Sequence, residues 1–194
     1  MATNLAERIV RKLIAVSVVE EGDRELYIYG FFLLITRFYF FLVTIAFGFF
    51  LRIPWESVIF YIVFILLRSY AGGVHAKTEM ACTVWTTLAM VIAVVAIKML
   101  EASSGKILLL LLFSNLCILL FNPLDSREKS LDAEERQRYR RICNWLLLIC
   151  DAVIFGAEIL MLPILCYPVA CSMFLEAILL GIGRICGHKK YESG

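Results

Sequence analysis

A histidine and a cysteine lie seven residues apart in the polar stretch between two long apolar runs. A cysteine attacks a carbonyl group as its thiolate, and an imidazole that accepts the thiol proton generates that thiolate at neutral pH. His75 and Cys82 are therefore candidates for the general base and the nucleophile of a cysteine active site. Glu79 lies between them and is a candidate to orient the imidazole, although a solvated carboxylate in a turn is the simpler interpretation.

The spacing of this pair constrains the backbone between the two residues. On an unbroken helix, residues seven apart share a face but lie about 10 Å from each other, which is too far for a hydrogen bond. Gly72 and Gly73 loosen the backbone just before His75, so we expect the chain to break or fold back before Cys82. At the N-terminus of the next helix, a cysteine gains thiolate stabilisation from the helix dipole, and free N–H groups there can bind an oxyanion.

Two other classes of function are open at this point. A non-enzymatic transporter or export component for a peptide or an ion is compatible with Arg37, because charges inside membrane spans often mark pathways. Arg37 is close enough to the start of its span, however, for its side chain to reach the interface. A metal site built from His75, Cys82 and Glu79 has too few convincing ligands. We expect neither a metal nor another cofactor.

The composition identifies a membrane protein. The chain has 194 residues, of which 61% are hydrophobic, and its mean hydropathy is +0.84, whereas soluble domains contain roughly 45–50% apolar residues. The net charge of +2 gives no indication of nucleic-acid binding. Of the seven cysteines, all but Cys82 lie in or beside apolar runs and match neither a zinc pattern nor a disulfide framework, so we interpret them as packing residues.

Six apolar runs predict a single all-α polytopic membrane domain. An amphipathic helix over residues 4–20 is expected before them, lying either in the headgroup plane or against the rest of the protein. The spans are predicted at residues 26–51, 53–67, 82–100, 107–121, 142–165 and 167–186. The second and fourth runs are shorter than the roughly 20 residues that cross a bilayer. Four full spans with two shallow or re-entrant segments are therefore the alternative architecture.

The basic residues predict the orientation of these spans. If the N-terminus is cytoplasmic, most of the 19 lysines and arginines fall on the cytoplasmic side, as the positive-inside rule requires. The exceptions are Arg37, Arg52, Lys98 and Lys106. The C-terminus and the stretch from His75 to Cys82 are then also cytoplasmic, where thiols stay reduced.

The longest polar segment, residues 122–141, ends in a basic cluster. Such a cluster usually anchors a span to anionic lipid headgroups. Binding of an acidic peptide is the alternative. The candidate substrate-binding residues in this segment are Lys129, Arg136, Arg138, Arg140 and Arg141.

The stretch around His75 resembles that of the accessory gene regulator protein B family of Gram-positive bacteria. These proteins are polytopic membrane cysteine endopeptidases that process the precursor of a quorum-sensing peptide. The family pattern is met by Arg68, Gly72, Gly73, His75, Ala76 and Cys82. The segment Asn122-Pro123-Leu124-Asp125 is similar to the family's proline-containing polar segment after the fourth span. The resemblance covers nearly the whole chain.

The resemblance implies a role for each matching residue. Cys82 is the expected nucleophile and His75 its general base, and Arg68, Gly72 and Gly73 are supporting residues. The implied substrate is a short membrane-associated propeptide, cleaved through a thioester on Cys82. A thiol or hydroxyl of the substrate then captures the acyl group and closes a thiolactone or lactone ring. The resemblance also implies a homodimer in the cell membrane.

Overall fold

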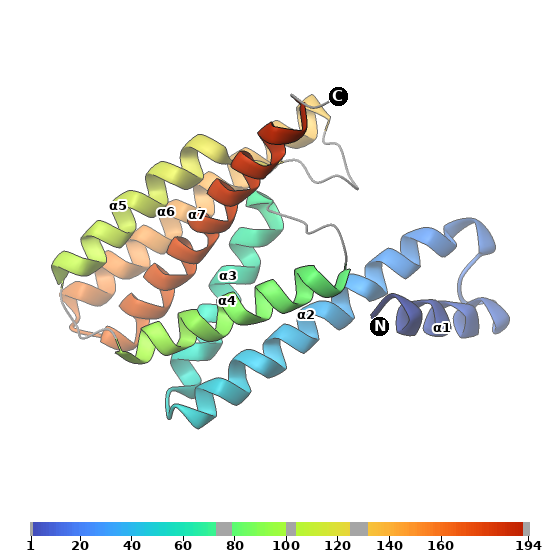
Figure 1. Ribbon diagram of the computed structural model, residues 1–194, viewed down its shortest axis with the longest axis horizontal. Coiled ribbons are helices and arrows are strands. Elements are labelled where there is room, and N and C mark those ends of the chain that lie inside the picture. The colour runs from blue at the N-terminus through green and yellow to red at the C-terminus, as the bar shows by residue number, and fades with distance from the viewer. Residues whose placement is uncertain (1, 73–78, 100–103, 125–131, 192–194) are drawn as a thin grey trace. The chain divides into compact units, whose positions relative to one another are not determined.

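The computed structural model describes residues 2–72, 79–99, 104–124 and 132–191 of the chain. In chain order its elements are α1 (Ala2–Ala15), the 3-10 helix η1 (Glu21–Asp23), α2 (Arg24–Phe50), α3 (Pro54–Ala71), α4 (Glu79–Met99), α5 (Ser104–Phe121), α6 (Ala133–Ile159) and α7 (Pro163–Tyr191), as Figure 1 shows. The described residues form no β-strand, and their isolated β-bridge joins Gly72 to Leu124. The chain divides into two units, Met1–Val43 and Thr44–Gly194.

The first unit begins with the amphipathic helix α1. Ala6 and Val10 on one side of α1 are buried, and Arg8 on the other side is exposed. α1 ends at Ala15 rather than at the expected residue 20. Ser17 adopts a left-handed conformation with φ of 56°, and the Val18 N–H donates to the Leu13 carbonyl oxygen at 2.9 Å. This arrangement is a common way to close the C-terminus of a helix.

Five of the described helices are long and apolar enough to cross a membrane, namely α2, α3, α4, α6 and α7. The apolar part of α5, Gly105–Phe121, is shorter. The sequence predicts two short runs, which correspond to α3 and α5. α3 is long enough to cross a membrane because it continues through Arg68 to Ala71, beyond its apolar run, whereas α5 remains short. The chain is therefore an all-α polytopic membrane protein, as its sequence predicts.

α7 is the central helix of the second unit. It packs against α3, α4, α5 and α6 (Figure 1), and 67% of its apolar stretch is buried, compared with 22% for α4. Ala170, Ser172 and Ala177 are buried on α7, and small residues of this kind let membrane helices approach closely. The Ser172 hydroxyl donates to the backbone carbonyl oxygen of Phe60 on α3 at 2.9 Å.

The bounds of α6 differ from those expected of the fifth span. α6 begins at Ala133 rather than at residue 142, because the charged residues before the apolar run are helical too. The turn between α6 and α7 lies at residues 160–162 rather than near 166. Met161 there has φ of 53°, and Pro163 is the first residue of α7. Pro168, near the expected boundary, lies inside α7, as neighbouring helices allow in membrane proteins.

Candidate active site

The last turn of α3 ends at a glycine with an unusual backbone conformation. Gly72 has φ of 82° and ψ of −160°, a region of backbone space essentially restricted to glycine. The Leu124 N–H donates to the Ala71 carbonyl oxygen at 2.9 Å, and a Cβ added at Gly72 would meet the Leu124 carbonyl oxygen. Glycine is required here because the segment that leaves α5 passes directly against the end of α3.

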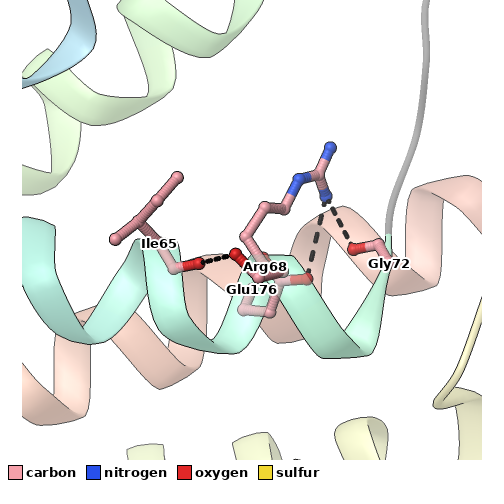
Figure 2. Close-up of polar contacts among 5 residues, drawn as sticks. Ile65, Arg68, Gly72 and Glu176 are labelled. Carbon is pink, nitrogen blue, oxygen red and sulfur yellow. Dashed lines mark hydrogen bonds and ion pairs between the residues drawn. The ribbon is translucent and has the colours of Figure 1, made fainter. Parts of the chain in front are cut away.

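Arg68, one turn before the end of α3, connects that end to α7. Its Nη1 donates to the Gly72 carbonyl oxygen at 3.2 Å and lies 3.7 Å from Oε1 of Glu176 on α7, as Figure 2 shows. The Arg68 side chain is 19% exposed and that of Glu176 is fully buried. A cation at this position also interacts favourably with the partial negative charge at the C-terminus of α3.

Cys82 lies in the opening turn of α4, which begins at Glu79. Its side chain is half-buried. The position at a helix N-terminus is one at which the dipole favours a thiolate over a thiol. Most of the other described cysteines are buried, as packing residues are: Cys143, Cys150, Cys166 and Cys171 are buried and Cys117 is half-buried.

Several predicted site residues lie outside the described residues. They are Gly73, His75 and Lys129. The pairing of His75 with Cys82 therefore stays a prediction, as does the proposed orienting role of Glu79. Among the described residues, the structure joins Arg68 and Gly72 through a hydrogen bond.

The four arginines of the basic cluster lie in the first part of α6. Arg136, Arg138, Arg140 and Arg141 are all exposed. Between them, Tyr139 makes an edge-to-face contact with Tyr70 on α3, with ring centroids 5.9 Å apart and an interplanar angle of 88°. This contact brings the arginine-containing part of α6 against the last turn of α3.

Sequence reasoning missed the residue on α7 that pairs with Arg68. Glu176 is the one acidic residue in the apolar stretch 163–185, and an ionisable residue inside a membrane helix is a functional candidate by default. That signal was available from the sequence. The partner of Glu176 could not be predicted from the sequence, because Arg68 and Glu176 lie on helices far apart in the chain.

Comparison with known proteins decides the family. The family model described as Accessory gene regulator B matches residues 2–183. The chain belongs to the accessory gene regulator B family. Accessory gene regulator protein B of Staphylococcus intermedius is 28% identical over 115 residues, which cover 58% of this chain and 61% of the relative. No solved structure matches the chain significantly.

Membership of the accessory gene regulator B family supports a role in the accessory gene regulator quorum-sensing system. It agrees with the multi-pass membrane architecture, since the family match extends from α1 into α7. The matched range also includes every candidate site residue discussed above, from Arg68 to Glu176.

Proposed function

We propose that the protein is a membrane cysteine endopeptidase that processes the precursor of a quorum-sensing peptide. Cys82 is the nucleophile and His75 is the general base. The observation that carries the proposal is the position of Cys82, half-buried in the opening turn of α4, within a chain of the accessory gene regulator B family. The geometry of a helix N-terminus supports a nucleophilic thiolate at that position.

The reaction follows from the chemistry of the two side chains. His75 accepts the Cys82 proton, and the sulfur attacks the carbonyl carbon of one peptide bond in the propeptide. Backbone N–H groups in the opening turn of α4 are suited to stabilise the resulting oxyanion. When the tetrahedral intermediate collapses, the C–N bond breaks and the imidazolium returns its proton to the leaving amine. The N-terminal part of the substrate remains bound to Cys82 as a thioester.

Ring closure completes the reaction. A thiol or hydroxyl of the substrate attacks the thioester carbon and transfers the acyl group to itself, so that Cys82 is released and a thiolactone or lactone forms. Exchange of one thioester for another requires no external energy source and no cofactor. Water must be kept from the thioester during this step, and a site at the membrane boundary favours its exclusion.

The neighbouring residues have supporting roles in this proposal. Arg68 and Gly72 shape the end of α3 from which the His75 segment departs, and Gly73 is a further supporting residue that the family resemblance implies. The exposed arginines of α6, whose first part contacts α3 through Tyr139, provide a basic surface for an acidic part of the propeptide. The active site and both termini are cytoplasmic, with a homodimer as the assembly.

The test uses purified protein in lipid vesicles and the candidate propeptide encoded beside its gene. Mass spectrometry follows cleavage and any acyl adduct on wild type, Cys82→Ala and His75→Ala. Cys117→Ala is the matched control, because Cys117 is also half-buried but lies on α5. We expect an acyl mass on Cys82 in wild type and in the control, and no cleavage by the other two variants. Full cleavage by Cys82→Ala and His75→Ala would refute the proposal.

The alternative is a non-enzymatic transporter or export component. It predicts movement of a peptide or an ion across vesicles that depends on Arg37 and not on Cys82. Arg37 is exposed on α2. Contrary to the expectation from the sequence, it lies in the middle of that helix, about 20 Å from either end, and a charge at such a depth is a functional candidate. Transport assays on vesicles that contain the Arg37→Gln or the Cys82→Ala protein therefore distinguish a transporter from a peptidase.

A further inference from the structure

Glu176 is a carboxylate in an unfavourable place. It lies on α7, the most buried of the five candidate membrane spans, and its side chain has no exposure to solvent. A buried charge is costly unless it is well paired. Among the described residues, neither of its oxygens has a hydrogen-bond partner. The 3.7 Å separation from Arg68 is an ion pair longer than a hydrogen bond.

A second acidic residue in the same bundle shows the contrast. Asp151 on α6 accepts hydrogen bonds from Nδ2 of Asn115 on α5 at both carboxylate oxygens, at 2.9 and 3.1 Å. That pair satisfies the carboxylate and joins two helices, which is sufficient to explain its presence. Glu176 is more deeply buried and less well satisfied, so a contribution to packing alone does not explain it.

The contacts of Arg68 indicate what Glu176 does. The same Nη1 atom lies near the Glu176 carboxylate on one side and donates to the Gly72 carbonyl oxygen on the other, and Figure 2 shows both contacts. The carboxylate on α7 therefore sets the position of the guanidinium, and the guanidinium holds the carbonyl group of Gly72. Gly72 is the last described residue before the segment that contains His75.

We propose that Glu176 is a positioning residue of the peptidase, which acts through Arg68 to fix the end of α3 from which the His75 segment departs. The inference rests on the proposed function. Glu176 does not touch the substrate in this account. Its removal lowers the rate of the chemical step while substrate affinity is retained, because only the placement of the general base is disturbed.

The test compares Glu176→Gln with wild type. Both proteins are full-length chains in lipid vesicles. Glutamine keeps the size of the side chain and removes its charge. We expect kcat for propeptide cleavage to fall about tenfold or more with KM changed less than about twofold, since a displacement of 1 Å can cost about 10²-fold in rate. Peptide-level mass spectrometry should also show slower iodoacetamide labelling of Cys82 at neutral pH, with Cys117 labelled as in wild type.

Controls separate this inference from the proposed function. Asp151→Asn removes the other membrane carboxylate described above and should retain wild-type kcat. Cys82→Ala tests the peptidase itself: cleavage by that variant overturns both proposals. Cleavage that requires Cys82 but proceeds at the wild-type kcat in Glu176→Gln overturns the role of Glu176 alone.

A second variant covers the case in which Glu176→Gln does not fold. Glu176→Asp keeps the charge but withdraws the carboxylate by one methylene from a contact that is already 3.7 Å long. An intermediate loss of kcat at unchanged KM supports the positioning role, and wild-type kcat in a folded Glu176→Asp overturns it.

Discussion

Replacement of Gly72 by alanine perturbs the end of α3 in two ways. The backbone of Gly72, with φ of 82° and ψ of −160°, is strained for any residue with a Cβ. The new methyl group would also meet the carbonyl oxygen of Leu124. That oxygen belongs to backbone rather than to a flexible side chain, so the segment after α5 must move away from α3. The movement breaks the hydrogen bond from Leu124 to Ala71.

The two effects set the size of the loss. Backbone strain at such a residue costs about 1–3 kcal/mol, and a lost hydrogen bond contributes about 1 kcal/mol. The free energy of unfolding should therefore fall by about 2–4 kcal/mol. In a chain of this length each kcal/mol shifts Tm by about 2–4 °C, so we expect Tm to fall by roughly 5–15 °C.

Thermal unfolding in detergent, followed by circular dichroism, measures this loss. Gly181→Ala is the matched control, because Gly181 lies inside α7 and a Cβ there meets nothing within 4 Å. Alanine in a helix interior is favoured over glycine by about 1 kcal/mol, so the control should melt at or above the wild-type temperature. If Gly72→Ala melts within about 1 °C of wild type, the close approach of Leu124 to α3 is not important for stability.

Three further predictions concern other contacts. Arg68→Met and Glu176→Met should each lower the free energy of unfolding by about 3 kcal/mol, because each leaves an uncompensated buried charge. The double variant should lose about 1–3 kcal/mol less than the sum of the two single losses. Additive losses in unfolding assays would contradict the ion pair. In the native protein, iodoacetamide should label Cys82 at least about tenfold faster than the buried Cys143. Peptide-level mass spectrometry measures the two rates, and equal rates would argue against an activated thiol. Ser172→Ala should lower the free energy of unfolding by only about 0.6 kcal/mol, the average contribution of an interhelical hydrogen bond in a membrane protein. Ser172→Leu should lower it by about 1–3 kcal/mol through overpacking. Thermal unfolding ranks the two variants, and the reverse order would contradict the tight packing of α7 on α3.

The helices could be predicted from the sequence because each apolar run in this chain forms a helix. The boundaries were predictable only where polarity changes. Residues 160–162 are as apolar as the helices on either side, so hydrophobicity gives no sign of the turn at Met161. Two prolines follow it. The sequence does not indicate which of them begins the helix, and the structure places Pro163 at its first position and Pro168 inside it. The start of α6 was missed for the opposite reason, since its first two turns are charged and still helical.

The candidate site was predictable as far as its residues are local in the chain. Cys82 could be placed at the start of a helix because a polar stretch precedes an apolar run. Gly72 was expected to loosen the backbone, whereas the structure gives it a more specific reason, the approach of Leu124. The contact of Arg68 with Glu176 depends on how α3 and α7 pack, and no local pattern in the sequence encodes that packing.

The last turn of α3 contacts both the segment that leaves α5 and the first part of α6. Leu124 is bonded to Ala71, and Tyr139 packs on Tyr70, the residue before it. A substitution at Tyr70 or Ala71 is therefore expected to disturb the positions of α5 and α6 as well as the end of α3.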